Sequence, residues 1–381
     1  MSHDCGLTEV RSNIGYVQPS RVLGINKRIM SRAAVLVTGA TGLLGSRMVD
    51  TLLAHGDCVR ALVRPGEVAD ELARPGVETC RGDLRDPASL QGAVAGMDRV
   101  IHCAARTGVW GPRGEYEITN VRGVEVLLDA ALAAGVRRFV HVSSIAVLGA
   151  DVGGIADETT PMRIDPNPYS WSKVMGERVV QHAIRDRNAP VTIVRPGWIY
   201  GPRDTGSFAR FAAMVQQGRM VLIGSGDNHV PLTYVSDVAE GILLASQAPE
   251  ALGKIYILVN DEPVTQREYL DAIAVELGVR GPTRRIPYRV AVSLGVISEA
   301  VGHLSRRTQP PPLSRYGVQL LAGENRFVIT RARKELGFSP RVHLADGVRK
   351  SVAWFREKYC AIDSGKQHSH TYFATNVGKD G

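Results

Sequence analysis

Short apolar runs alternate with amphipathic stretches over the first half of the chain. The apolar runs of strand length are Val35–Val37, Val59–Val63, Val77–Cys80, Arg99–Cys103, Phe139–Val142 and Val191–Val194. Stretches with helical periodicity, such as Ser46–Ala54 and Gly123–Ala134, lie between them. Alternation of this kind is typical of a parallel sheet that helices cover on both faces. We therefore predict an α/β fold with a doubly wound parallel sheet over residues 31–195.

The pattern becomes irregular beyond Pro196. Glycine and proline interrupt it at Gly201-Pro202, Gly224-Ser225-Gly226 and Glu262-Pro263. Residues 196–358 are therefore predicted to form mostly a smaller C-terminal substrate-binding region. Ligands of doubly wound sheets bind at the carboxyl ends of the strands, so both regions should meet there. Residues 1–30 and 359–381 are predicted to be a disordered leader and a disordered tail.

One segment of the second half carries a helical stripe. Between Tyr288 and Leu304, apolar residues recur at alternating spacings of four and three, at Val290, Leu294, Ile297, Val301 and Leu304. The arginines that flank this stripe are Arg284, Arg285, Arg289, Arg306 and Arg307. Two interpretations are open. The segment is a lid or an interfacial helix, which implies peripheral membrane contact, or it is a helix whose stripe faces the core.

Composition narrows the class of protein. The chain has 381 residues, 44% of them hydrophobic and 22% charged, which is ordinary for a globular protein. Its net charge of +8 indicates a mild attraction to anionic ligands or membrane surfaces. The basic residues are scattered and not interleaved with aromatic residues, so we expect no nucleic-acid partner. The 5 cysteines show no metal-like spacing, which predicts no metal site and a reducing, cytoplasmic compartment.

A glycine-rich turn follows the first apolar run, and its residues are Thr38-Gly39-Ala40-Thr41-Gly42-Leu43-Leu44-Gly45. In such a strand-to-helix turn, glycines let the backbone turn, approach a phosphate and pack closely against the helix. The helix N-terminus then offers N–H donors to a pyrophosphate. The turn predicts a Rossmann dinucleotide site, although a merely structural turn is the alternative. The predicted cofactor contacts are Gly39, Thr41, Gly42, Leu43, Leu44 and Gly45.

A tyrosine and a lysine four residues apart predict a catalytic pair. Tyr169 and Lys173 open a predicted helix and share one of its faces. The ammonium of Lys173 is expected to lower the pKa of Tyr169, which can then exchange a proton with a carbinol or carbonyl oxygen. The strand Phe139–Val142 ends in Ser143 and Ser144, whose hydroxyl can orient the same oxygen. A chance surface pair is the alternative.

These residues together resemble the extended short-chain dehydrogenase/reductases of the NAD-dependent epimerase/dehydratase superfamily, over residues 33–355. The resemblance implies that Ser144, Tyr169 and Lys173 are catalytic. Ser144 is chosen over Ser143 because it lies five residues before Gly149, the spacing usual in the family. The resemblance also implies that subunits pair into a homodimer through helices that flank the sheet.

Further segments match the cofactor positions of that family. Asp83, in Arg81-Gly82-Asp83-Leu84, resembles the residue that contacts the adenine. The nicotinamide ribose is expected beside Ala104 and Ala105, and the segment beginning Arg195-Pro196 is expected to close over the nicotinamide. Asn120 matches an asparagine that opens the next helix. Leu84, Pro196, Tyr169 and Lys173 complete the predicted cofactor contacts.

The end of the second predicted strand favours NADP(H). An NAD-selective site usually carries an acidic residue there, bonded to the ribose hydroxyls. In this chain Val63 and Arg64 occupy that position. Without a carboxylate there is no repulsion against a 2′-phosphate, and Arg64 can hold that phosphate in a bidentate contact. We therefore expect NADP(H) as the cofactor, with NAD(H) as the alternative. If Arg64 is merely solvated, it has little effect on the choice of cofactor.

The second half bears on the substrate. Many nucleotide-sugar enzymes of this fold carry an Arg-Asp pair where this chain has Val230 and Pro231. The segment Asn228–Asp237 instead resembles the 3β-hydroxysteroid dehydrogenase branch, which includes sterol-carboxylate dehydrogenases and long-chain β-keto acid reductases. This implies an oxidoreductase that interconverts a secondary alcohol and a ketone on a steroid-like or long-chain substrate. The alternatives are a nucleotide-sugar 4-epimerase or dehydratase and a non-catalytic NADP-binding protein.

Overall fold

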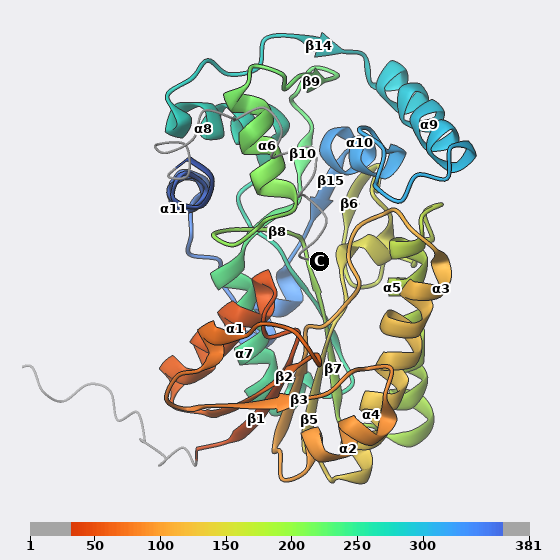
Figure 1. Ribbon diagram of the computed structural model, residues 1–381, viewed down its shortest axis with the longest axis vertical. Helices are drawn as coiled ribbons and strands as arrows, with labels where there is room; N and C mark the ends of the chain where they lie inside the picture. The colour runs from red at the N-terminus through yellow and green to blue at the C-terminus, as the bar shows by residue number, and fades with distance from the viewer. Residues whose placement is uncertain (1–31, 361–381) are drawn as a thin grey trace, which may run out of the picture. The chain divides into compact units, whose positions relative to one another are not determined.

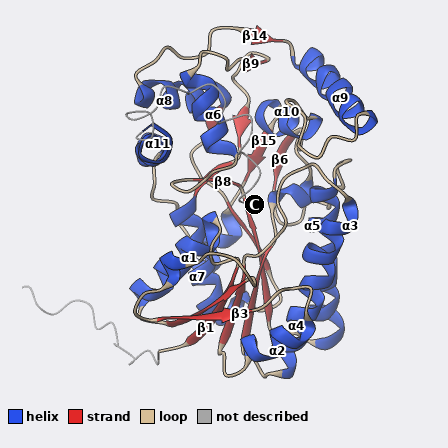
Figure 2. Cartoon of the chain, viewed as in Figure 1, coloured by secondary structure: helices blue, strands red, loops and turns tan. Residues whose placement is uncertain are grey.

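The structure of the chain is a computed structural model that describes residues 32–360. The predicted leader and nearly all of the predicted tail lie outside these residues. The described chain forms a central sheet with helices on its two faces, and a group of smaller strands and helices beside one end of that sheet (Figures 1 and 2).

The central sheet has seven strands in the order β12-β7-β5-β4-β1-β2-β3. All of its pairings are parallel. The strands are β1 (Ala34–Thr38), β2 (Cys58–Val63), β3 (Val77–Arg81), β4 (Arg99–His102), β5 (Arg138–Val142), β7 (Val191–Pro196) and β12 (Ile255–Leu258). Each apolar run that predicted a strand is one of them. The prediction of a doubly wound parallel sheet is confirmed.

The edge strand β12 is a finding that the sequence pattern did not indicate. It pairs with β7 through the register Ile255↔Ile193 to Leu258↔Pro196. An isolated apolar run of four residues does not distinguish a strand from a helix, and its partner lies some sixty residues earlier in the chain. The sheet is therefore completed by a strand from the region predicted to bind mostly substrate. The division of the chain at residue 196 stays a prediction.

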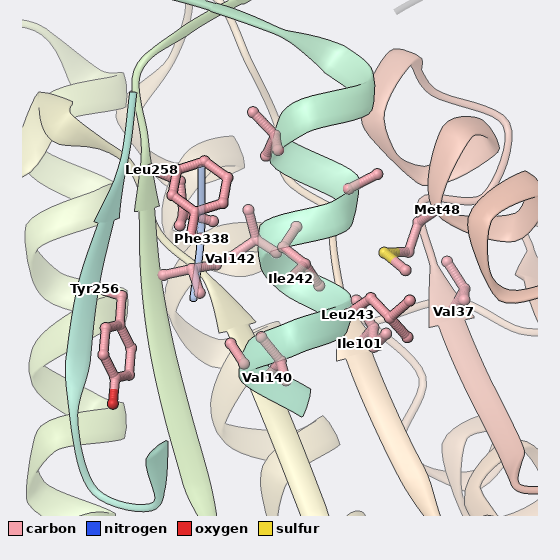
Figure 3. Packing of buried hydrophobic residues seen from close by; sticks show 14 of the residues in the cluster. Val37, Met48, Ile101, Val140, Val142, Ile242, Leu243, Tyr256, Leu258 and Phe338 are labelled. Atoms are coloured by element: carbon pink, nitrogen blue, oxygen red, sulfur yellow. The ribbon is translucent and has the colours of Figure 1, made fainter. Parts of the chain in front are cut away.

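Helices cover both faces of the sheet (Figure 1). The helices α1 (Leu43–His55) and α7 (Val235–Gln247) pack on one face. The other face carries α2 (Pro87–Val94), α4 (Gly123–Ala133) and α5 (Pro168–Arg187). Figure 3 shows Ile242 and Leu243 of α7 beside the strand residues Val140 and Ile101. Side chains of this kind contribute about 1.5 to 3 kcal/mol each when fully buried.

The smaller group of elements has its own core. The helices α6 (Ser207–Gln216), α8 (Gln266–Leu277) and α11 (Leu344–Phe355) pack around Phe208, Tyr269 and Phe355, which are buried. Its paired strands are β8 (Trp198–Tyr200) with β11 (Leu232–Tyr234), β10 (His229–Val230) with β13 (Val264–Thr265), β9 (Leu222–Ile223) with β14 (Arg285–Ile286), and β6 (Gly154–Ala156) with β15 (Asn325–Phe327).

The remaining α-helices of the described residues are α3 (Arg113–Glu117), α9 (Tyr288–Leu304) and α10 (Arg315–Ala322). The bounds of α9 are those predicted, but the interpretation that its apolar stripe faces the core is wrong. The stripe residues are between 45% exposed, at Leu294, and 86% exposed, at Leu304. Among the described residues, no helix has both the length and the apolar character that a membrane crossing requires.

Candidate active site

The glycine turn between β1 and α1 forms a tight backbone cradle. Gly39 has φ +68°, and a Cβ there would lie 2.8 Å from the backbone of Ala104. A Cβ on Gly45 would lie 1.9 Å from the carbonyl oxygen of Gly39, so this position also requires glycine. Gly42 precedes the first residue of α1 and provides no side-chain cap. The first N–H groups of α1 are therefore open to an anionic group, as a pyrophosphate site requires.

A hydrogen-bonded chain fixes the end of β4 against this turn. The Oγ1 atom of Thr38 lies 2.8 Å from His102 Nδ1 and accepts a hydrogen bond from Ala104 N at 3.1 Å. Ala104 and Ala105 are partly exposed and follow directly. The residues predicted to contact pyrophosphate and nicotinamide ribose thus lie side by side, and the cradle fits a dinucleotide.

The ends of β2 and β3 correct one premise of the NADP prediction. A carboxylate is present nearby, on Glu67, which the strand pattern did not indicate. It accepts hydrogen bonds from Arg64 Nε at 3.1 Å and from Thr41 Oγ1 at 2.7 Å. Partial burial acts to raise the pKa of Glu67, but the bonds from Arg64 and Thr41 outweigh it and the pKa is lowered. The Arg64 side chain is still 60% exposed, so its guanidinium remains accessible.

Asp83 lies at the same edge of the sheet, at the end of β3. Its carboxylate accepts hydrogen bonds from Arg85 Nε at 2.9 Å and Arg85 Nη2 at 2.6 Å. These bonds lower the pKa of Asp83. The next residue, Leu84, is buried against Gly123 at the start of α4. Asp83 is thus an ionised side chain held beside the strand end, and its contact with adenine stays a prediction.

The two serines after β5 differ in their surroundings. Ser143 is buried, and its hydroxyl donates to Glu177 Oε2 at 2.5 Å. Ser144 is partly exposed, and its hydroxyl lies close enough to Tyr169 to act to lower the pKa of that tyrosine. Its Oγ also accepts from Ala146 N at 3.1 Å, in the turn that follows the strand. Ser144 is therefore the serine whose hydroxyl is available beside the tyrosine.

Tyr169 lies in the first turn of α5, where Asn167 caps the helix by accepting a hydrogen bond from Ser170 N at 2.8 Å. Desolvation raises the pKa of Tyr169, and the interaction with Ser144 only partly offsets this. The expectation that Lys173 lowers this pKa is not met: burial makes the largest contribution, and the two side chains that act on Tyr169 are Ser144 and Tyr116. Two further tyrosines interact with Tyr169. Tyr116 acts to raise the pKa of Tyr169, and Tyr169 in turn acts to raise the pKa of Tyr316 of α10.

Lys173 lies beneath the site, one helical turn after Tyr169. It is 5% exposed, and its Nζ donates to the carbonyl oxygen of Val142 at 2.8 Å. Desolvation lowers the pKa of Lys173 to about 8, although Glu177 and Cys103 act to raise it. Burial also lowers the pKa of the neighbouring His102 to about 3, so this imidazole is neutral at physiological pH. The cation at this position is therefore Lys173.

A buried ion pair one further turn along α5 was missed by the sequence interpretation. Glu177 is 0% exposed and Arg195 of β7 is 2% exposed. Arg195 Nη2 donates to Glu177 Oε1 at 2.5 Å, and Arg195 Nε lies 3.1 Å from Glu177 Oε2. With Ser143, this pair joins α5 to β5 and β7. The sequence did contain one indication of the role of Glu177: Tyr169, Lys173 and Glu177 are spaced four residues apart, which places them on one helix face.

Asn120 supports the site from the neighbouring helical segment. It is buried, and its Nδ2 donates to Ser172 Oγ and to the carbonyl oxygen of Arg106, both at 2.9 Å. Its Oδ1 accepts from Arg106 N at 2.7 Å. The loop that follows Ala104 and Ala105 is thereby tied to α5. Pro196, at the end of β7, is buried and pairs with Leu258.

The two positions where many nucleotide-sugar enzymes carry an Arg-Asp pair are apolar and buried in this chain. Val230 is 4% exposed, and Pro231 is also buried. The polar residues before them have structural partners: Asn228 Nδ2 donates to the carbonyl oxygen of Leu321 at 2.8 Å, and His229 Nδ1 lies 2.8 Å from Glu324 Oε1. No cationic side chain for a diphosphate is provided at these two positions.

The arrangement can perform proton transfer beside a nucleotide cradle. Ser144 and Tyr169 present hydroxyls at the carboxyl edge of the sheet, and Lys173 places a buried cation behind them. The structure brings these three together next to the end of β4 and the glycine turn. Their catalytic roles, like the individual cofactor contacts, stay predictions.

Sequence comparison identifies a family. The model of the NAD dependent epimerase/dehydratase family matches residues 35–258. A 2-alkyl-3-oxoalkanoate reductase of Stenotrophomonas maltophilia is 33% identical over 84% of this chain and 98% of its own length. A 3 beta-hydroxysteroid dehydrogenase/Delta 5-->4-isomerase of Mycobacterium tuberculosis is 32% identical over 80% of this chain and 86% of its own length.

Solved structures with the same fold are also similar. The crystal structure of gox2253 has a TM-score of 0.73 and 32% identity, and the match covers 86% of this chain and 99% of that one. MoeE5 in complex with UDP-glucose and NAD has a TM-score of 0.68 and 25% identity, over 85% of this chain and 99% of that one. These likenesses confirm the Rossmann-type fold predicted from the glycine turn and the strand pattern.

The buried ion pair yields a prediction for stability. Glu177→Gln leaves the guanidinium of Arg195 buried without a counter-charge, and we expect the free energy of unfolding to fall by about 3 to 5 kcal/mol. Urea denaturation measures this change. The matched control is Asp129→Asn, which breaks the half-exposed pair with Arg187 and should cost about 1 kcal/mol or less. Equal losses in the two variants would show that the Glu177–Arg195 pair does not anchor α5.

Proposed function

The chain belongs to the NAD-dependent epimerase/dehydratase family, and we propose that it is an NADP(H)-dependent oxidoreductase that interconverts a secondary alcohol and a ketone in a hydrophobic substrate. One observation carries the proposal. The hydroxyl of Ser144 lies beside Tyr169, and Lys173 follows Tyr169 by one turn of α5, at the edge of the sheet where the glycine turn lies. This combination suits proton exchange with an oxygen whose carbon exchanges a hydride.

Tyr169 is the proton donor when a ketone is reduced. Because its pKa is raised, the phenol is neutral at physiological pH and can donate a hydrogen bond to a carbonyl oxygen. As negative charge develops on that oxygen, the proton of Tyr169 moves to it. Ser144 donates a second hydrogen bond and orients the oxygen. A bound nicotinamide supplies the hydride in this direction and accepts it in the other.

Lys173 stabilises the phenolate that Tyr169 becomes. Its Nζ is fixed by the carbonyl oxygen of Val142 and is almost fully removed from solvent. A charge in such surroundings interacts more strongly with a new anion than a charge in water does. The ion pair of Glu177 and Arg195 holds the register of α5 against the sheet, so that Lys173 stays beneath Tyr169. Glu177 is therefore a positioning residue.

The exposed guanidinium of Arg64 supports NADP(H) as the cofactor. Arg64 Nε is bonded to Glu67, but the side chain is largely exposed at the carboxyl end of β2. Arg81 Nη1 donates to the carbonyl oxygens of Arg64 and Glu67, so a second guanidinium lies close by. A 2′-phosphate would therefore meet two cations and one carboxylate. Glu67 is the group that opposes NADP(H) and favours NAD(H).

The apolar positions Val230 and Pro231 support a hydrophobic substrate. They stand where many nucleotide-sugar enzymes carry an Arg-Asp pair, so the arginine that could contact a diphosphate is missing, and both are buried. The names of two relatives, a 2-alkyl-3-oxoalkanoate reductase and a 3 beta-hydroxysteroid dehydrogenase, agree with a ketone or alcohol on a large apolar skeleton. The likeness to MoeE5 keeps a nucleotide-sugar enzyme as the competing function, and turnover of such sugars without net NADPH consumption would favour it.

Substitution of the acid/base residue tests the proposed function. Tyr169→Phe removes the donated proton, and we expect kcat/KM for reduction of a 2-alkyl-3-oxoalkanoate or a 3-oxosteroid by NADPH to fall at least about 100-fold. Fluorescence titration should give an NADPH affinity close to that of the wild type. Tyr256→Phe is the control, because its hydroxyl is bonded to Glu335 and should leave turnover unchanged. Retained turnover in Tyr169→Phe would exclude this mechanism.

The lowered pKa of Lys173 predicts the pH dependence of reduction. Below pH about 8 the ammonium is charged and supports the forming phenolate. As the pH rises through that value the charge is lost, so kcat/KM for reduction should fall between about pH 7.5 and 9. In Lys173→Arg the cation persists to much higher pH, and the falling limb should move upward. An identical limb in both proteins would assign it to another group.

The cofactor proposal is tested by two opposed substitutions. Arg64→Ala should lower the ratio of kcat/KM for NADPH to that for NADH at least about tenfold, because one charge-assisted contact is lost. Glu67→Gln should raise the same ratio, because it removes the competing carboxylate. Arg74→Ala is the control, since Arg74 pairs with Asp50. A ratio unchanged in Arg64→Ala, or a wild-type preference for NADH, would contradict the proposal.

A further inference from the structure

Helix α9 packs against the rest of the protein through its small residues and through the partly buried Tyr288 and Val292 near its start. Its buried residues are Ala291, Gly295 and Gly302. A Cβ on Gly295 would lie 2.9 Å from the backbone nitrogen of Arg315, where α10 begins. A Cβ on Gly302 would lie 2.9 Å from the Trp110 ring. Figure 1 shows α9 at the upper right edge, with α10 on its inner side.

The acidic residue of α9 also faces inward. Glu299 accepts hydrogen bonds from Arg315 N and Arg315 Nε, both at 2.8 Å. Its side chain is 16% exposed, so its charge is neutralised at the contact with α10. The inner face of α9 therefore combines small residues with a paired charge. In an ordinary surface helix most large apolar side chains face the core, whereas in α9 only Tyr288 and Val292 do so.

The outer face of α9 carries the large apolar side chains. The exposed fractions along the stripe are Val290 47%, Leu294 45%, Ile297 58%, Val301 54% and Leu304 86%. Val296, elsewhere on the helix, is 43% exposed. Spacings of four and three place the stripe residues in one row along the whole helix. A continuous apolar row of this kind on a protein surface marks an interaction site.

Arginines stand at both ends of the row. Arg284, Arg285 and Arg289 lie at its start, and Arg306 and Arg307 follow its end. All five are exposed, and none forms an ion pair with an acidic side chain in residues 32–360. With Glu299 already neutralised by Arg315, the outer surface of this helix is apolar in the middle and cationic at its ends.

We propose that α9 is an interfacial helix that docks the protein on an anionic lipid bilayer. Its apolar row would enter the boundary between headgroups and acyl chains, while the arginines contact anionic headgroups. Charge complementarity selects this partner. In a contact between two copies of the chain, parallel or antiparallel, the arginine clusters of one α9 would face those of the other, and this repulsion disfavours self-association. The helix lies on the bilayer and does not cross it.

The docking surface is joined to the loop beside the active site. The Trp110 ring packs at a tilt against His303 of α9, with ring centroids 4.3 Å apart, and its Nε1 donates to the carbonyl oxygen of Arg307 at 3.0 Å. Trp110 belongs to the loop that follows Ala104 and Ala105. A bilayer against α9 would thus lie near the site, where a lipophilic substrate dissolved in it can enter. This last step rests on the proposed function, whereas docking itself does not.

Vesicle flotation of the full chain without substrate tests the docking. We expect binding to vesicles of phosphatidylcholine with 30% phosphatidylglycerol, and at least about tenfold weaker binding to phosphatidylcholine alone. The double variant Ile297→Ser/Val301→Ser should bind the anionic vesicles at least about tenfold more weakly, as should Arg306→Gln/Arg307→Gln. Val275→Ser is the control, because Val275 of α8 is 75% exposed and lies outside α9. Unchanged thermal unfolding would show that the variants are folded.

Three results would overturn the proposal. The first is no binding to anionic vesicles at low salt, and the second is equal binding by the wild type and both α9 variants. The third is a concentration-dependent dimer that the Ile297→Ser/Val301→Ser variant abolishes, which would assign the surface to a second copy of the chain. Because no turnover is measured, failure of docking and failure of the proposed function are distinguishable.

Discussion

The ion pair between Glu177 and Arg195 sets the position of the helix on which the proposed chemistry depends. Helix α5 carries Tyr169, Lys173 and Glu177 on one face, and Glu177 is held by Ser143, which follows β5, and by Arg195 of β7. Burying two charges is costly, and this pair is compensated by short hydrogen bonds and by Ser143. In return, the pair fixes the position of α5 along the sheet. When Glu177 is anchored, Lys173 reaches the carbonyl oxygen of Val142, and Tyr169 lies beside Ser144.

A second constraint aligns the nucleotide cradle with this helix. Gly39 admits the backbone of Ala104, and Thr38 bonds both to His102 and to Ala104. The loop that continues from Ala104 is then tied to α5, because Asn120 bonds to Arg106 and to Ser172. Backbone contacts on one side and a side-chain network on the other therefore converge on the same edge of the sheet. A dinucleotide in the cradle and a substrate oxygen at Tyr169 would meet there.

The sequence predicted what depends on local pattern. Apolar runs located all but one strand of the sheet, and the spacing of four placed Tyr169 and Lys173 on one face. What it missed depends on partners distant in the chain. Strand β12 is defined by its pairing with β7, and the role of Glu67 by contacts with Arg64 and Thr41. The stripe of α9 was found, but only packing of Gly295 and Gly302 against other segments decides which face is outward. The raised pKa of Tyr169 likewise follows from its burial.

The central claim is that the site moves a hydride to or from the carbon of a hydrophobic substrate, with net consumption of the cofactor. Label transfer tests this most directly. NADPH carrying deuterium at both C4 positions of the nicotinamide is incubated with the protein and a 2-alkyl-3-oxoalkanoate or a 3-oxosteroid, and the product is analysed by mass spectrometry. The account predicts one deuterium at the new carbinol carbon for each NADPH oxidised. Absence of label with both substrates, together with epimerisation of a nucleotide sugar without NADPH oxidation, would contradict it.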